Sequence, residues 1–452
     1  MGTIQLLKTK LLNRDNPRSF QMQKNIILSL FFKGISILTS LVLVPMTLHY
    51  LNPTEYGVWL TLSSIMTWIT LFDIGLGNGL RNKLAEALAL GDREKGKVLV
   101  STTFALLVII IGIFLILFFL INPFLDWSSI LNTSATSIKN LNRIVLIVFV
   151  FFSLQFIFKT VGTIFVSDQK PAANDFLGAI SSLLSLVVIY LLSLFTSGSL
   201  LYVSIVFSSI PAIVFLITFF VIFKFQYKYL GPSYHSIDWS YTKGLMNLGV
   251  QFFILQIGGL ILYFSSNIIV AQLYSPYEVT VYNIAYKYAN IIAMICIIII
   301  TPLWSSSTEA YYLKDWKWFK QVEKRMLMIF FLVIVSASLI LFASSWFYKF
   351  WIGDAIHIPF QLTLVMISYN LCFVFSSIYI YMLNGIGKIR LQLWSSVTET
   401  IFTIPLCILF GKSIGIEGVV LGMLVMILFR CVWAPIQFRK IITEKATGIW
   451  NK

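Results

Sequence analysis

The chain has 452 residues, of which 58% are hydrophobic and only 11% are charged. Charged residues make up about a quarter of a typical soluble domain, so this composition excludes an ordinary soluble globule. The net charge of +15 would suit a nucleic-acid partner, but the basic residues stand between hydrophobic segments and form no polar domain. We therefore expect the protein to act inside a membrane, with no nucleic acid bound.

Twelve hydrophobic segments follow one another along the chain, each long enough to cross a bilayer, which takes roughly twenty apolar residues. The first six are 25–48, 56–76, 98–121, 144–166, 176–194 and 202–223. The second six are 244–273, 279–303, 327–346, 362–383, 393–410 and 418–438. Because the connections are too short for a soluble domain, the sequence predicts an all-α integral membrane protein.

The twelve segments divide evenly into two predicted six-helix lobes, an N-lobe (25–223) and a C-lobe (244–438). Residues 1–24, 224–243 and 439–452 then form an N-terminal segment, a linker and a C-terminal tail. Basic residues gather in these three parts and in every second connection; the alternate connections hold only Lys139, Arg143, Lys349 and Lys412. Since basic loops are retained in the cytoplasm, both termini are predicted to be cytoplasmic, next to anionic lipid.

Several classes of site have no support in the sequence. The basic, polar N-terminus lacks the pattern of a cleaved signal peptide. All four cysteines fall within predicted helices and the three histidines lie in different connections, so neither a disulfide framework nor a metal site is expected. No nucleotide-binding Walker loop is present. We expect no cofactor and no metal.

A short turn motif occurs twice. Residues Leu51–Trp59 join the first two predicted helices, and a degenerate copy, Leu273–Tyr282, joins helices seven and eight. At a constant offset, the pairs Pro53 and Pro276, Glu55 and Glu278, Val58 and Val281, and Trp59 and Tyr282 align. Chance recurrence of a turn is the alternative. Equivalent positions in two six-helix halves favour a parallel repeat and alternating access around a central path.

The motif and its continuation resemble a known family. Pro53–Trp59 and Leu71–Asn82 look like the signature of Wzx-type O-antigen and capsule flippases, which belong to the multidrug/oligosaccharidyl-lipid/polysaccharide exporter superfamily. The second half agrees at Gln251–Gln256, Asn267–Ile269, Tyr282–Lys287, Leu303–Ser305 and Glu309–Ala310. The resemblance implies a bacterial inner-membrane protein that moves an undecaprenyl-diphosphate-linked oligosaccharide repeat unit from the cytoplasmic to the periplasmic leaflet. It also implies a polysaccharide polymerase and chain-length machinery as partners.

Five ionisable residues fall where the membrane is expected: Lys33, Asp73, Lys159, Lys287 and Glu399. Such residues usually face a cavity and mark function. Lys33 and Asp73 are predicted at similar depth on antiparallel helices. Either Lys33 binds substrate and Asp73 takes part in ion coupling, or the two residues form a structural ion pair. Glu399 is predicted either to couple transport to a cation or to pair with a lysine.

Each lysine also has a simpler interpretation. Lys33 and Lys159 lie close enough to the cytoplasmic face to snorkel, and Arg430 is expected to do so. Lys287 lies roughly 15 Å below the outer turn, at 1.5 Å per residue, which is too deep for easy snorkelling. Lys287 is therefore the lysine for which we favour contact with substrate.

Polar residues form two helix faces in the second half. Asn283, Lys287 and Asn290 share one face of helix eight, and Gln256, Tyr263 and Asn267 share one face of helix seven. Such faces would suit a wet groove for sugar hydroxyls. The alternative is hydrogen bonding between neighbouring helices, which is common in membrane bundles.

The residues favour a flippase over two alternatives. The three lysines predicted within the membrane outnumber the two acids, which suits a negatively charged diphosphate. A lysine in a low-dielectric cavity attracts such a group strongly. A multidrug cation antiporter coupled to H⁺ or Na⁺, from the same superfamily, should prefer acids. A membrane polysaccharide polymerase should carry catalytic groups on an outer loop, but residues 122–143 contain few candidates.

Overall fold

The computed structural model describes residues 17–67, 76–133, 140–242, 265–301, 303–354 and 356–451, and within them it contains helices and turns but no β-strand. In this part of the chain, ten helices are long and apolar enough to cross a membrane: Ile27–Tyr50, Arg93–Phe124, Leu141–Ser167, Pro171–Phe195, Leu200–Lys224, Pro276–Ile300, Trp316–Ile352, Phe360–Ile386, Arg390–Ile414 and Ile416–Ile442. Each overlaps one predicted segment. The other two predicted segments, 56–76 and 244–273, lie partly outside the described residues, so the number twelve stays a prediction.

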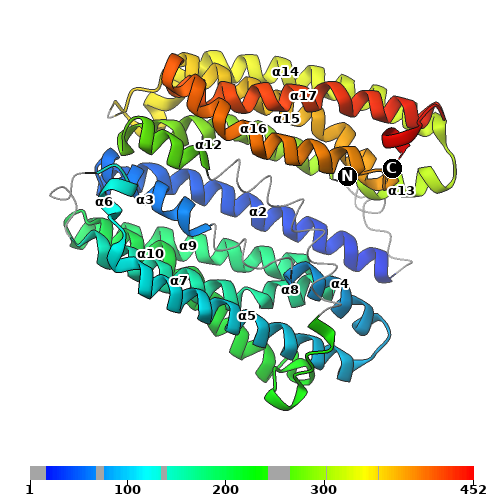
Figure 1. The fold of residues 1–452 in the computed structure, drawn as a ribbon, viewed down its shortest axis with the longest axis horizontal. Helices are drawn as coiled ribbons and strands as arrows, with labels where there is room; N and C mark the ends of the chain where they lie inside the picture. Colours follow the sequence, from blue (N-terminus) through cyan, green and yellow to red (C-terminus); the bar gives the residue numbers. More distant parts are fainter. Residues whose placement is uncertain are drawn as a thin grey trace, which may run out of the picture. The chain divides into compact units, whose positions relative to one another are not determined.

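The chain forms two compact units (Figure 1). Unit 1 comprises Met1–Asn52, Met66–Ser128 and Ser134–Phe253; unit 2 comprises Pro53–Ile65, Ser129–Thr133 and Ile254–Lys452. Among the described residues of the predicted N-lobe, two short segments, 53–65 and 129–133, belong instead with unit 2.

The described residues of unit 1 form the helices α2 (Pro17–Tyr50), α4 (Leu76–Ala89), α5 (Arg93–Ile121), α7 (Leu141–Phe158), α8 (Thr160–Ser167), α9 (Pro171–Phe195) and α10 (Leu200–Lys224). Helix α2 packs along α9, α10 packs on α7 and α9, and α4 packs on α5 and α8. Their buried side chains form one apolar cluster that includes Leu84, Leu99, Val161 and Leu230. Leu230 comes from a connecting loop, so the loop after α10 closes this core.

Local sequence signals explain where these helices begin. Asp92 caps α5, because its carboxylate accepts a hydrogen bond from the backbone N–H of Lys95 at 3.0 Å. Pro171 stands at the first position of α9, where its missing N–H would have no helical partner. The polar loop after α10, with the short helices η3 (Lys228–Leu230) and η4 (Tyr234–Ser236), is held on α5 through the hydroxyls of Ser101 and Thr102.

Unit 2 contains most of α3 (Pro53–Thr67), a helical segment at 265–273, and α12 (Pro276–Ile300), α13 (Leu303–Tyr312), α14 (Trp316–Ile352), α15 (Phe360–Ile386), α16 (Arg390–Ile414), α17 (Ile416–Ile442) and η5 (Gly448–Asn451). Helix α17 packs on both α15 and α16, and α15 packs on α12 and α13. Gly422 permits the tight α16–α17 contact, since a Cβ there would lie 2.6 Å from the backbone nitrogen of Cys407.

The loop that includes α6 (Trp127–Ile130) joins unit 2 through side-chain amides. The amide of Asn132 donates to the carbonyls of Ala271 and Tyr274, at 2.8 and 3.1 Å. In return, Gln272 donates to the carbonyls of Ser129 and Ile130, at 2.9 and 2.6 Å. These four bonds explain why residues 129–133 group with unit 2.

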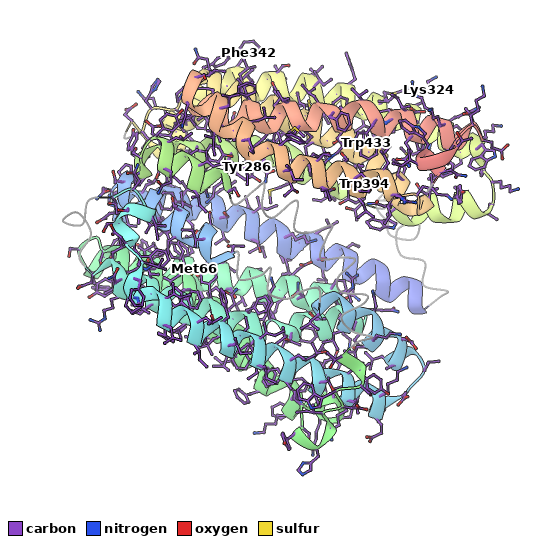
Figure 2. The ribbon with its side chains drawn as sticks, in the orientation of Figure 1. Met66, Tyr286, Lys324, Phe342, Trp394 and Trp433 are labelled. Atoms are coloured by element: carbon purple, nitrogen blue, oxygen red, sulfur yellow. The ribbon has the colours of Figure 1, made fainter. Side chains whose placement is uncertain are left out.

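Exposed apolar side chains indicate which helix faces contact lipid. Helix α14 carries Phe342, which is 78% exposed and projects away from unit 2, whereas Trp433 of α17 is 4% exposed (Figure 2). At 37 residues, α14 measures roughly 55 Å at 1.5 Å per residue, well beyond the hydrocarbon core of about 30 Å. Its basic first turns, around Lys317 and Lys324, must therefore extend out of the apolar layer.

Candidate functional site

Glu399 and Arg430 form a buried ion pair between α16 and α17. The Arg430 Nε donates to Glu399 Oε1 at 3.1 Å, and Nη2 bonds Oε2, so the guanidinium contacts both carboxylate oxygens. Such a bidentate pair is a strong, directional interaction. Glu399 is 2% exposed. Arg430 was expected to snorkel; the structure instead makes it the partner of Glu399, in place of the expected lysine.

Further polar groups fix the carboxylate of Glu399. The hydroxyl of Ser395 donates to Glu399 Oε1 at 2.9 Å and accepts from the indole N–H of Trp433, also at 2.9 Å. A cavity of about 20 Å³ lies beside the pair, lined among others by Thr403 and Tyr369. This space is large enough for one water molecule. The site therefore holds a neutralised carboxylate with room for a small ligand.

Two amides of the predicted polar faces, those of Asn267 and Asn283, are bonded to one another. The side-chain N–H of Asn283 donates to Asn267 Oδ1 at 2.8 Å, and the N–H of Asn267 donates to the Ser64 hydroxyl at 2.7 Å. All three residues are buried. This chain joins α3, the segment 265–273 and α12, as interhelical hydrogen bonding predicts. Gln256 and Tyr263, the other members of the helix-seven face, lie outside the described residues.

Lys287 and Asn290 continue the same face of α12, one and two turns beyond Asn283. Both are half-buried. In the described part of the chain, Lys287 takes part in no ion pair. On this face, therefore, Asn283 is engaged in a hydrogen bond, whereas no described residue forms an ion pair with Lys287.

In unit 1, Lys33 of α2 lies beside a carboxylate that we did not predict. Its Nζ is 3.8 Å from Asp175 Oδ2 on α9, and the hydroxyl of Ser29 also bonds that oxygen. The Lys33 side chain is 58% exposed and that of Asp175 is 17% exposed. Asp73, the expected partner, lies outside the described residues. Asp175 was missed because the predicted segment began at residue 176, whereas α9 begins at Pro171.

Lys159 stands at a break in the fourth predicted helix. Helix α7 ends at Phe158 and α8 begins at Thr160, while the Lys159 N–H still bonds the carbonyl of Gln155 at 2.8 Å. Its side chain is exposed. The exposure agrees with snorkelling and gives no support for a place in a buried cavity.

A polar cluster that the sequence analysis did not predict lies where α8 meets the loop after α10. The Tyr227 hydroxyl donates to Asp168 Oδ2 at 2.6 Å, and Lys170 bridges both groups at 2.6 and 3.3 Å. Burial and the Asp168 carboxylate raise the pKa of the Tyr227 phenol. The charged and polar groups of this cluster are bonded to one another, which indicates a structural role.

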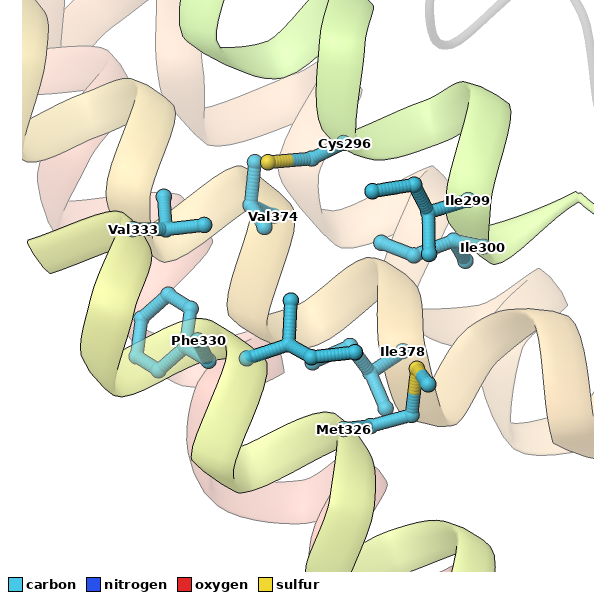
Figure 3. A pocket seen from close by; sticks show the side chains of 9 residues that line it. Cys296, Ile299, Ile300, Met326, Phe330, Val333, Val374 and Ile378 are labelled. Carbon is cyan, nitrogen blue, oxygen red and sulfur yellow. The ribbon is translucent and has the colours of Figure 1, made fainter. Parts of the chain in front are cut away.

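Other features of the described residues do not form a catalytic or metal centre. No group of three His, Cys, Asp or Glu side chains that could hold a metal occurs in this part of the chain. A pocket between α12, α14 and α15 is lined by Cys296, Phe330, Val374 and other apolar side chains (Figure 3). Its volume of about 10 Å³ leaves no room for a sugar.

The fold resembles that of solved membrane transporters. An inward-facing multidrug resistance MATE family transporter of the MOP superfamily superposes with a TM-score of 0.73 at 14% identity, over 93% of this chain and 100% of that one. An outward-facing MATE structure gives a TM-score of 0.66 at 13% identity, over 98% and 99% of the two chains. The described chain therefore combines ten helices able to cross a membrane with the fold of the MATE structures.

The family follows from the sequence comparison. The model of the family described as "Polysaccharide biosynthesis protein" matches residues 22–308, more than half of the chain, so the chain belongs to that family. It is also 24% identical over 425 residues to a protein of Yersinia pseudotuberculosis described as "Putative O-antigen export protein", covering 90% of this chain and 93% of that protein. The resemblance to the polysaccharide exporters is confirmed.

Proposed function

We propose that the protein is a flippase for an undecaprenyl-diphosphate-linked oligosaccharide, a repeat unit of O-antigen, capsule or a related polysaccharide. It moves this lipid from the cytoplasmic to the periplasmic leaflet of the bacterial inner membrane. Membership of the polysaccharide biosynthesis family and the relative described as an O-antigen export protein support this substrate class. The MATE fold supports a transporter that works by alternating access.

The observation that carries the proposal is the charge balance of unit 2. Glu399 is neutralised by Arg430, while Lys287 is half-buried and, within the described residues, outside every ion pair. Of these three groups, Lys287 is the charge for which no described residue provides an ion-pair partner. A diphosphate is attracted to such a lysine more strongly than in water, because the surrounding dielectric is low.

The proposed substrate contacts follow from the same geometry. Lys287 binds the diphosphate, and Asn290 hydrogen-bonds a sugar or phosphate oxygen beside it. Asn267 and Asn283 hold the helices together through their mutual hydrogen bond. They can contact sugar only through the amide donors and acceptors that this bond does not use. Lys33, Lys159, Gln256 and Tyr263 stay secondary candidates for the path.

Energy coupling is proposed to involve Glu399. Protonation of this carboxylate would remove the negative charge that pairs with Arg430, and the adjacent cavity of about 20 Å³ has room for one water molecule. Asp73 is the second candidate for coupling or for a structural pair. Cation-coupled antiport would then load Glu399 in one conformation and release it in the other.

A second candidate function is multidrug cation antiport, which the likeness to MATE structures favours. One reconstitution separates the two. Purified protein in proteoliposomes is given fluorescent polyprenyl-diphosphate oligosaccharide in one arm and a fluorescent cationic drug in the other. Leaflet transfer of the lipid, measured by quenching or by lectin capture, supports the flippase. Drug transport without lipid transfer would refute it.

The topology is part of the proposal. Two lobes, 25–223 and 244–438, are related by a parallel repeat, and both termini are cytoplasmic. Reporter fusions after Lys97 and Lys243 should read cytoplasmic, because basic connections are retained there. A fusion within residues 128–137 should read periplasmic. A reversed reading at any of the three sites would refute the orientation.

A further inference from the structure

The C-terminal end of the chain lies near α13 (Figure 1). A second polar pocket is formed there, between α13, the start of α14, the end of α17 and the C-terminal residues. Its volume is about 370 Å³, within the range of small-molecule sites, and it is open to the surface. Four chain segments contribute to its lining: Tyr311 of α13, Lys314 and Trp316 at the start of α14, Ile441 and Glu444 at the end of α17, and Ala446 and Asn451 of the tail.

The tail that forms one wall is attached to the helices. Gln437 of α17 is buried, and its amide donates to the carbonyls of Lys388 and Trp450, at 3.1 and 3.2 Å. The Nζ of Lys440 lies 4.1 Å from the centre of the Trp450 ring, a cation–π contact. These contacts hold η5 on α16 and α17, so the pocket is a built feature of the fold.

Two opposite charges line this pocket. Lys314 and Glu444 each follow the end of a helix, with φ values of 53° and 56°. The helix ends are closed by backbone bonds from Asp315 to Ala310 and from Lys445 to Lys440, the usual left-handed helix stop. Among the described residues, no ion pair involves either Lys314 or Glu444.

The opposite charges of Lys314 and Glu444 disfavour ligands that carry only positive or only negative charge. A purely anionic group bound at Lys314 would also face the carboxylate of Glu444, and a purely cationic group would face the ammonium of Lys314. A zwitterion with its two charges a few atoms apart satisfies both. Tyr311 and Trp316, whose ring centres lie 5.9 Å apart, add an aromatic wall of the kind found at membrane interfaces.

We propose that this pocket binds a phosphoethanolamine group. Lys314 contacts the phosphate, Glu444 contacts the ammonium, the Trp316 ring covers the ethylene link, and the Asn451 amide donates to a phosphate oxygen. The chemistry is shared by the headgroup of phosphatidylethanolamine and by soluble phosphoethanolamine. The site is separate from Lys287 and does not depend on which substrate is transported.

Lipid binding to the purified full-length protein tests the proposal. Native mass spectrometry in detergent measures the affinity for phosphatidylethanolamine and, in parallel, for phosphatidylglycerol of the same acyl chains. We expect a preference of about tenfold for phosphatidylethanolamine, the size of one charge-assisted hydrogen bond. Equal affinity for the two lipids would overturn the proposal.

Two variants distinguish this pocket from general attraction to basic residues. Lys314→Gln should lower phosphatidylethanolamine affinity about tenfold. Glu444→Gln should also lower it, yet raise phosphatidylglycerol affinity, because the repelling carboxylate is gone. An unfolded variant could not gain binding in this way. The matched controls Lys317→Gln and Lys445→Gln change neighbouring charges that do not line the pocket, and should leave the preference intact.

A competition experiment distinguishes a lipid headgroup from free phosphoethanolamine as the ligand. If soluble phosphoethanolamine at millimolar concentration displaces the lipid, the pocket accepts the free compound; if it does not, the pocket requires the lipid. Both results support a phosphoethanolamine site. An unchanged ratio of the two lipid affinities in Glu444→Gln would contradict it.

Discussion

The hydroxyl of Thr280 donates a hydrogen bond to the carbonyl oxygen of Pro53 at 2.6 Å. Pro53 begins α3 and Pro276 begins α12, and these are the aligned prolines of the repeated turn motif. Gly57, the counterpart of Thr280 in the first copy, lies against the carbonyl oxygen of Pro276, where a Cβ would come within 1.6 Å. Each copy thus contacts the proline that begins the helix of the other copy. This reciprocal arrangement within unit 2 supports the repeat.

The first prediction concerns this contact. Gly57→Ala should destabilise the protein by about 1–3 kcal/mol, because the added methyl group overlaps the Pro276 carbonyl and the two helix ends must separate. The measurement is the midpoint of thermal unfolding in detergent. Gly112→Ala in α5 is the matched control, since a Cβ there meets nothing within 4 Å. Equal midpoints for both variants would show that the close approach does not exist.

The second prediction concerns Lys287. Lys287→Ala should abolish leaflet transfer of the lipid-linked oligosaccharide while protein level and insertion are unchanged, because the diphosphate loses its cation. Lys287→Arg keeps the charge and should retain part of the transfer. Lys412→Ala removes an exposed lysine of α16 and serves as the control. Wild-type transfer by Lys287→Ala would remove this residue from the proposed site.

The third prediction concerns the Glu399–Arg430 pair. Glu399→Gln leaves a buried guanidinium without its counter-charge, which should lower stability by about 3–5 kcal/mol. Glu399→Gln with Arg430→Met removes both charges and should recover much of that loss. Thermal unfolding of the single and double variants measures the difference.

The same variants separate coupling from structure. If Glu399 couples transport to protons, the double variant will fold and transfer lipid, but its rate will no longer respond to an imposed pH gradient. A gradient response equal to that of the wild type would make the pair purely structural. Proteoliposomes with and without the gradient provide this measurement.

The fourth prediction concerns the carboxylate with which Lys33 forms its ion pair. A double-mutant cycle of Lys33→Gln with Asp175→Asn should give a coupling energy of about 1 kcal/mol or less, because the lysine is more than half exposed. The parallel cycle with Asp73→Asn tests the pair expected from depth. A larger coupling to Asp73 than to Asp175 would show that Asp73 is the principal partner of Lys33.

The sequence alone was sufficient for the membrane class and for most of the helices. A helix in lipid must satisfy its own backbone hydrogen bonds within a continuous apolar stretch. That requirement is local, so ten described helices coincide with predicted segments. Even so, boundaries shifted: α9 begins at Pro171, and this places Asp175 within the helix.

Which polar groups meet was decided by the tertiary structure. Arg430 lies one helix away from Glu399, and nothing in its own segment distinguishes an ion-paired arginine from a snorkelling one. The bond from Asn267 to Ser64 joins residues 203 positions apart. Hydropathy determines how deep a residue lies, but the direction it faces and its neighbour depend on how the helices pack. Side-chain pairing is a property of that packing, and this is why the contact of Lys33 with Asp175 could not be predicted from the sequence.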